Sequence, residues 1–177
     1  MNDYAAYARL FHETAVSHGW WEGPRPRGEV YALIHSEWSE ALEEYRHGKP
    51  MRYFGGGDGI FDEPTEQWKK PEGIAVELAD GVIRILDYRA TLDVPDPVYP
   101  EIDVKGLTLP CLIAELHALT TDAYRAGDPS VESGILLAAA DAVFAWIRAN
   151  GTDPVYIIEE KHAYNETRSY RHGGKKA

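Results

Sequence analysis

The segment that covers residues 74–86 constrains the fold most, because as a helix it is apolar over nearly its whole circumference. A helix of this kind belongs inside a core, with other elements packed around it. Glu77 and Asp80 are three positions apart and are therefore neighbours on one face of that helix. The chain must therefore bury this helix, and the helix places carboxylates in or beside the core. The polar residues of this helix form one narrow stripe, which consists of Glu77, Asp80, Arg84 and Asp87.

Apolar spacing is helical in most other segments too, and no convincing run of alternating strand pattern is present. We therefore expect an all-α fold, with residues 1–177 forming a single domain built as a bundle of about five to six helices. Residues 49–71, which are rich in glycine and proline, are expected to form a long loop. The expected helices cover approximately residues 3–17, 29–47, 72–93, 107–126, 131–149 and 154–168.

A weak internal repeat pairs Leu33-Ile34 with Leu112-Ile113 and Ala79-Asp80 with Ala140-Asp141. It suggests a degenerate duplication of a helix pair, although chance similarity between amphipathic helices is an equally open explanation. In the second copy, apolar residues stand where the first copy has glutamates. The second copy is therefore expected to be structural. These apolar counterparts are Leu116, Leu119 and Ala138.

Composition excludes several classes of protein. The chain has 29 acidic and 18 basic side chains and a formal net charge of −11, which disfavours general nucleic-acid binding. Its one cysteine, Cys111, cannot form an internal disulfide or a thiolate metal site. No uninterrupted apolar stretch reaches the ~18 residues of a membrane span, and the first residues do not resemble a signal peptide. We therefore expect a soluble, cytoplasmic protein.

The charge is distributed unevenly along the chain. Residues 161–177 contain five basic side chains and one acidic side chain, whereas the remainder is strongly acidic. Such a tail is either a frayed, solubilising terminus or a segment that binds a polyanion.

The predicted second helix carries its own acidic pair. Glu37 projects from the middle of an apolar arc and Glu40 lies beside that arc. Two helices thus each offer two carboxylates from an apolar setting, and oxygen ligands of this kind suit Mg²⁺ or Mn²⁺. Solvated acids, or a plain ion pair of Arg84 with Glu77 or Asp80, are the structural alternatives. A di-iron bundle would require two Glu-x-x-His spacings, and the chain has one, from Glu159 to His162.

Residues 35–46 and 70–87 together resemble the paired Glu-x-x-Glu and Glu-x-x-Asp motifs of MazG-like nucleoside triphosphate pyrophosphohydrolases. Residues 164–175 also resemble the tail of phage and actinobacterial members. The resemblance implies an all-α enzyme that cleaves a (d)NTP to the monophosphate and pyrophosphate with Mg²⁺, for which Mn²⁺ could substitute. It also implies that the metal ligands are Glu37, Glu40, Glu77 and Asp80.

In this reading a metal-activated water attacks the α-phosphorus, and either Glu37 or Glu40 accepts its proton. Trp38 is expected to stack on the base, and Asn165 to contact a base edge or a phosphate. The sequence leaves open which nucleotide is preferred and whether the chain forms a homo-oligomer. The alternative is a non-catalytic acidic helical protein that binds a basic partner. The residues expected to bind the β- and γ-phosphates are Lys161, Arg168, Arg171 and Lys175.

Overall fold

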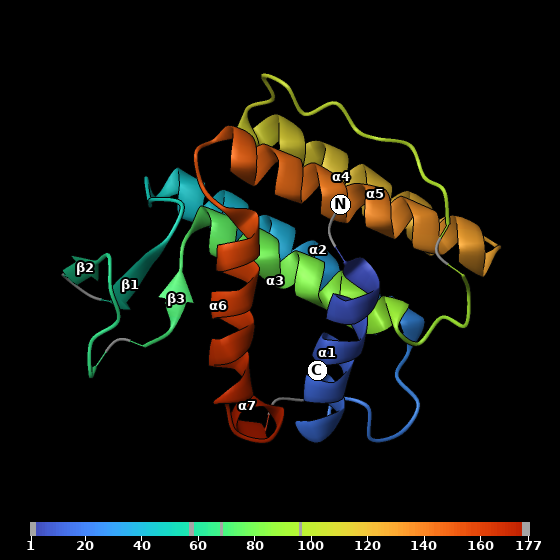
Figure 1. Ribbon diagram of the computed structural model, residues 1–177, viewed down its shortest axis with the longest axis horizontal. Coiled ribbons are helices and arrows are strands. Elements are labelled where there is room, and N and C mark those ends of the chain that lie inside the picture. The colour runs from blue at the N-terminus through green and yellow to red at the C-terminus, as the bar shows by residue number, and fades with distance from the viewer. Residues whose placement is uncertain (1–2, 57–58, 68, 96, 175–177) are drawn as a thin grey trace.

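The computed structural model describes residues 3–56, 59–67, 69–95 and 97–174. This part of the chain is mostly helical with one small sheet, so the predicted all-α class is confirmed (Figure 1). All six expected helices are present, with ends that differ from the prediction by a few residues. They are α1 (Tyr4–Ser17), α2 (Arg27–Arg46), α3 (Ile74–Arg89), α4 (Leu109–Arg125), α5 (Pro129–Ala149) and α6 (Pro154–Glu166), and a single further turn, α7 (Arg171–Gly174), follows.

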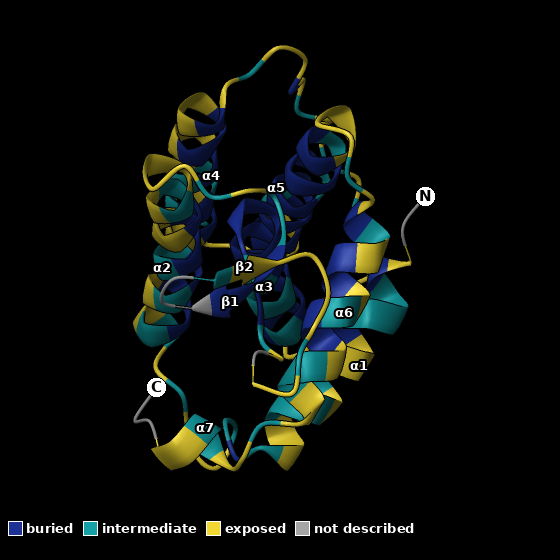
Figure 2. Ribbon diagram, turned by 90° about the vertical axis from the view of Figure 1, so that its left-hand side faces the viewer, coloured by how far each residue is buried: buried dark blue, intermediate teal, exposed yellow. Residues whose placement is uncertain are grey.

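The apolar helix predicted from the sequence, α3, lies at the centre of the molecule. It packs against α1, α2, α5 and α6, and Figure 2 shows most of it buried. Gly81 allows the close crossing of α2 and α3, because a Cβ at this position would lie 2.1 Å from the ring of Trp38. Burial of the apolar surface of α3 from several sides stabilises the fold.

Helices α4 and α5 run beside α2 and α3 and close the core on one side (Figure 1). In this second helix pair, Leu116 and Ala138 are buried, and Asp141 accepts hydrogen bonds from the hydroxyls of Tyr4 and Tyr99. The second pair therefore contributes to packing at the positions where the first pair carries its glutamates.

Helix α5 has the length and apolar composition of a membrane-spanning helix. Of its most apolar 18-residue window, 72% is buried inside the protein. It is the one described helix with these properties, and core helices of soluble proteins share them.

Three aspartates fix the starts of helices. The side chains of Asp3, Asp128 and Asp153 each accept a hydrogen bond from a backbone N–H in the first helical turn. A proline follows Asp128 and Asp153 directly, where its missing N–H costs the helix nothing. The boundaries of α1, α5 and α6 therefore follow from local sequence.

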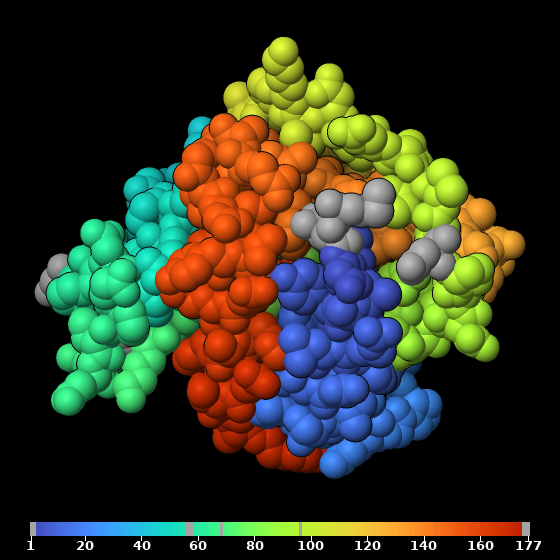
Figure 3. All heavy atoms as spheres, in the orientation of Figure 1, coloured from blue at the N-terminus to red at the C-terminus, as the bar shows by residue number. Residues whose placement is uncertain are grey.

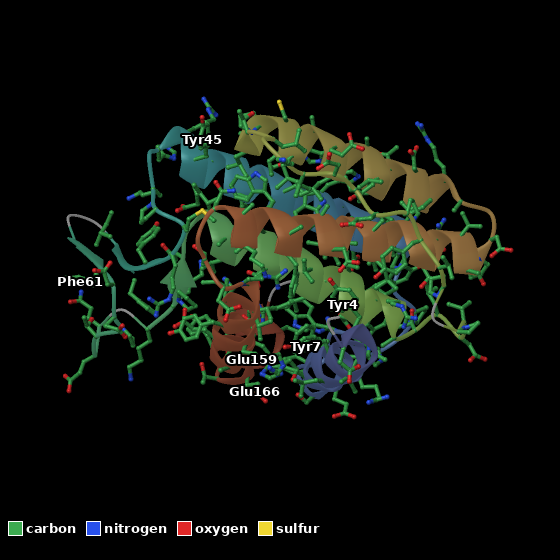
Figure 4. All side chains as sticks on the ribbon, turned by 45° about the horizontal axis from the view of Figure 1, so that its top comes forward. Tyr4, Tyr7, Tyr45, Phe61, Glu159 and Glu166 are labelled. Carbon is green, nitrogen blue, oxygen red and sulfur yellow. The ribbon has the colours of Figure 1, made fainter. Side chains whose placement is uncertain are left out.

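Helices α1 and α6 lie side by side across α3 and cover it on the face seen in Figure 3. The hydroxyl of Tyr7 donates a hydrogen bond to Glu159 Oε1 at 3.1 Å, and Figure 4 shows these two side chains between the helices. The rings of Phe11 and His162 are also in contact, with centroids 4.9 Å apart. These contacts join α6 to α1, and both helices also pack on α3.

The expectation of one long loop at residues 49–71 is wrong. Strands β1 (Tyr53–Gly56), β2 (Gly59–Phe61) and β3 (Pro71–Glu72) form an antiparallel sheet in the order β2-β1-β3. In the register of this sheet, Phe54 lies opposite both Phe61 and Pro71. Strands of two to four residues are too short to produce a recognisable alternation in the sequence. The sheet extends from the helical body beside the ends of α2 and α3 (Figure 1).

Candidate active site

A cavity of about 280 Å³ lies between α1, α2, α3, α6 and the C-terminal segment. All four predicted acidic residues line it, two from α2 and two from α3. Their i,i+3 spacing places each pair on one face of its helix, and the packing of α2 on α3 turns the two faces toward each other. The acidic residues are Glu37, Glu40, Glu77 and Asp80.

Three of the four carboxylates converge. One oxygen from each of Glu37, Glu40 and Glu77 lies within 4.8 Å of the others. Glu37 is 3% exposed and Glu77 is 5% exposed, whereas Glu40 is accessible to solvent. Carboxylates this close together repel one another unless protons or cations compensate their charge. The donor set, oxygen only, fits a hard divalent cation such as Mg²⁺ or Mn²⁺.

Arg84 supplies one compensating charge. Its Nε donates to Glu37 Oε1 at 2.5 Å. The ion-pair alternative from the sequence names Glu77 or Asp80 as the partner of Arg84, whereas the structure pairs it with Glu37. The side chain of Arg84 is 36% exposed and lines the cavity. Arg84 therefore compensates the buried Glu37 and still reaches the solvent-filled part of the site.

Asp80 lies in the same cavity but has other partners. Its carboxylate accepts a hydrogen bond from Lys161 Nζ at 2.8 Å and a longer one from Asn165 Nδ2 at 3.5 Å. Both donors lie on α6. It is not part of the three-carboxylate group. Lys161 is 1% exposed, and this corrects the expectation that it is a free contact for the β- and γ-phosphates.

Burial controls the protonation of the site. Loss of hydration raises the pKa of Glu37 to about 7, and the nearby charges of Asp80 and Glu40 add to the rise while Arg84 opposes it. Burial likewise raises the pKa of Glu77 to about 7, against the opposing charge of Lys161. Burial disfavours the charged form of Lys161 itself, but Asp80 and Glu77 outweigh this and raise its pKa. The site thus holds protons near neutral pH that a divalent cation would displace.

Other predicted substrate contacts fall in different places. Arg168 and Asn165 line the cavity, and the buried Oδ1 of Asn165 has no hydrogen-bond partner in the described part of the chain. Arg171 lies outside the cavity lining, and its Nε donates to the carbonyl of Gly19 at 3.1 Å. Lys175 is outside the described residues.

The predicted base-stacking role of Trp38 is wrong. Trp38 is 0% exposed, its ring packs on Gly81, and its indole Nε1 donates to Thr120 Oγ1 at 3.0 Å. A ring enclosed on all sides has no free face for a base. Its position on the apolar arc of α2 makes it a core residue.

Several cavity residues were not predicted. Asp87 Oδ1 accepts hydrogen bonds from His12 Nδ1 and Trp21 Nε1, both at 2.8 Å. Asp87 stood on the polar stripe of α3 in the sequence, so its position was available from the helical period. The remaining unpredicted lining residues come from helices and connectors alike, and in the connectors spacing carries no such information. Those with a polar or aromatic group are Phe11, Thr14, His18, Trp20, Arg25, Lys70, His162 and His172.

The basic tail closes one end of the cavity. The backbone N–H of Arg171 donates to the carbonyl of His18 at 3.0 Å, and a ring nitrogen of His18 contacts the carbonyl of Arg168 at 2.8 Å. The ring of His172 meets that of Trp20 at an angle of 82°, with centroids 5.0 Å apart. Within the described residues, the tail therefore forms part of the cavity wall through Arg168 and His172.

Comparison with known proteins gives no match. No protein-family model, no curated protein and no solved structure matches this chain. Function therefore has to be inferred from the geometry and chemistry of the cavity.

Proposed function

We propose that this chain is a Mg²⁺-dependent nucleoside triphosphate pyrophosphohydrolase, which converts a (d)NTP to the monophosphate and pyrophosphate. The observation that carries the proposal is the convergence of Glu37, Glu40 and Glu77 at the wall of a cavity. Two of these carboxylates are buried, and the cost of burying their charge is compensated by protons, by strong donors or by a cation. The paired motifs shared with MazG-like enzymes support the same conclusion.

The cavity also offers positive charge for a polyphosphate. Arg84, Arg168 and Lys70 line it together with the acids, each from a different part of the chain. Guanidinium groups bind phosphate oxygens through two parallel hydrogen bonds, which fixes orientation as well as charge. A cavity with carboxylates and basic groups side by side suits a metal-complexed polyphosphate better than a neutral ligand.

The residues divide into two roles in the proposed reaction. A bound Mg²⁺ supplies neutralisation of phosphate charge and a water molecule of lowered pKa. Of the three converging carboxylates, Glu40 alone is accessible to solvent, which favours it over Glu37 as the group that accepts the proton of the attacking water. Arg84, Arg168 and Lys70 hold the phosphates in place, and Asn165 offers its unpartnered Oδ1 to a donor on the substrate.

The test is a product analysis with each of the eight common nucleoside triphosphates and Mg²⁺. We expect release of pyrophosphate and nucleoside monophosphate, and we expect Glu40→Gln to lower kcat by at least about 100-fold. The matched control is Glu43→Gln, because Glu43 is an exposed acid on the same helix that does not line the cavity. Absence of pyrophosphate release from all eight nucleotides would refute the proposal and favour the acidic interaction protein.

A further inference from the structure

Beside the acidic cavity lies a buried cation, Lys161, to which the proposed function assigns no role. Lys161 is 1% exposed, and its ammonium bonds to Asp80 Oδ2 at 2.8 Å. Helix α6 brings this lysine in from a part of the sequence far from both acidic motifs. A fully buried ammonium requires a permanent anionic partner, because an unpaired buried charge is strongly destabilising. Asp80 is that partner.

The geometry separates the four acids into two groups. Glu37, Glu40 and Glu77 lie close enough to share one ion, whereas Asp80 is outside that group and bonded to Lys161. If Asp80 turned toward a metal ion, Lys161 would lose its closest anionic partner inside the core. The Lys161–Asp80 pair is therefore expected to persist when the three other carboxylates bind a cation.

The charges lead to the same conclusion. Once a cation has displaced their protons, the four carboxylates carry four negative charges, and the cations paired with them, Arg84 on Glu37 and Lys161 on Asp80, return two. The remaining two negative charges match one divalent ion. A second ion would give these paired groups an excess of two positive charges, in a setting where charge is poorly hydrated.

We propose that Lys161 is a built-in cation that takes the place of a second metal ion, so that the chain binds one divalent cation at Glu37, Glu40 and Glu77. Asp80 then acts as the positioning partner of Lys161 and not as a metal ligand. This inference rests on the proposed function, since it concerns the same metal site. It assigns the number of ions, which the paired acidic motifs leave open.

The experiment is a titration of the metal-free full chain with Mn²⁺, followed by the electron paramagnetic resonance signal of the free ion. The wild-type protein is expected to bind one Mn²⁺ per chain. Lys161→Met removes the charge and keeps a similar length. It frees Asp80 as a ligand and lowers the positive excess that a second ion would bring from two charges to one, so this variant is expected to bind two Mn²⁺ per chain. Lys161→Arg is the charge-preserving control and is expected to bind one.

A second variant keeps the test decisive if Lys161→Met does not fold. The double variant Asp80→Asn/Lys161→Met removes the pair without changing the net charge of the cavity. It is expected to bind one Mn²⁺ with an affinity within about threefold of wild type, whereas Glu77→Gln is expected to lose at least about 100-fold. Circular dichroism checks that each variant is folded.

The outcomes distinguish the two proposals. Two Mn²⁺ ions in the wild type, one ion in a folded Lys161→Met, or a loss of 100-fold in the double variant would each overturn the role of Lys161 and leave the metal-dependent function standing. No Mn²⁺ binding by the wild type would overturn the metal site itself, and the proposed function with it.

Discussion

Arg84 Nε lies 2.5 Å from Glu37 Oε1, so the buried glutamate of α2 is paired with an arginine of α3. This contact joins the two acidic motifs directly. It also places a cation where a metal ion would otherwise provide the positive charge. In the proposed metal site, Arg84 would therefore compete with the ion for Glu37, and it would be available for phosphate in the same cavity.

Replacement of Arg84 should affect metal and substrate in opposite directions. In Arg84→Met the competing charge is lost, so we expect Mn²⁺ to bind about tenfold more tightly. We also expect KM for the triphosphate to rise at least about tenfold, because a phosphate contact is lost. Calorimetric titration with Mn²⁺ and steady-state kinetics measure the two effects. Arg46→Met, at an exposed site on α2, is the control. If Arg84→Met bound both Mn²⁺ and the triphosphate more tightly, or both more weakly, this role of Arg84 would be contradicted.

Stability of the metal-free protein should depend on pH through Glu37 and Glu77. Both carboxyls have a pKa of about 7 in the folded chain, whereas an unfolded glutamate titrates near 4.3. Between these values the folded state binds more protons than the unfolded state, so the free energy of unfolding falls as the pH rises. For each group the slope is at most ~1.4 kcal/mol per pH unit.

Thermal unfolding in EDTA at several pH values between 5 and 8 measures this effect. We expect the difference in Tm between Glu37→Gln/Glu77→Gln and the wild type to grow in favour of the variant as the pH rises. Addition of Mg²⁺ should stabilise the wild type most at the high end of the range, where the carboxyls have lost their protons. A difference in Tm that does not change with pH would show that these carboxyls titrate normally.

Gly81→Ala should destabilise the protein although alanine is the better helix former by ~1 kcal/mol. A Cβ at this position would lie 2.1 Å from the ring of Trp38, and overpacking of a core typically costs about 1–3 kcal/mol. Gly134→Ala on α5 is the matched control, because its Cβ would make ordinary contacts at 3.6 Å and beyond. We expect urea denaturation to show a loss for Gly81→Ala and a gain of up to ~1 kcal/mol for Gly134→Ala. Equal gains in both would contradict the close crossing of α2 and α3.

Arg168→Ala should weaken binding of the polyphosphate without unfolding α6. Arg168 is half-buried at the cavity, follows the end of α6, and has its guanidinium 5.9 Å from the ring centre of Tyr164. We expect KM for the triphosphate to rise about tenfold, with an unchanged helical circular dichroism signal. Arg148→Ala, on the exposed side of α5, serves as the control. An unaltered KM would assign the tail a purely structural role.

The sequence predicted the helices well because each has a local cause. Apolar spacing of 3.6 residues identified α3 as a central helix, and Asp128 and Asp153, each followed by proline, mark the starts of α5 and α6. The sheet at residues 53–72 was missed because its strands are short and held by tertiary context. Helical period alone also placed each pair of acids on one face of its helix.

The division of roles among the polar residues could not be predicted. Lys161 was assigned to the substrate because it stands in a basic segment, yet α6 packs that position into the core beside Asp80. Trp38 and Glu37 are adjacent on α2, and both are buried, but only the packing of α3 with Gly81 shows that the ring is fully enclosed. Which face of a helix meets which neighbour is a property of the tertiary structure.

The most direct measurement of the central claim is a crystal structure of the chain grown with Mn²⁺, with anomalous diffraction to locate the ion. The account predicts an anomalous peak roughly 2.1 Å from carboxylate oxygens of Glu37, Glu40 and Glu77, in the position where their oxygens already converge. An empty cavity at saturating Mn²⁺, with these three carboxylates held by Arg84 and protons instead, would contradict it.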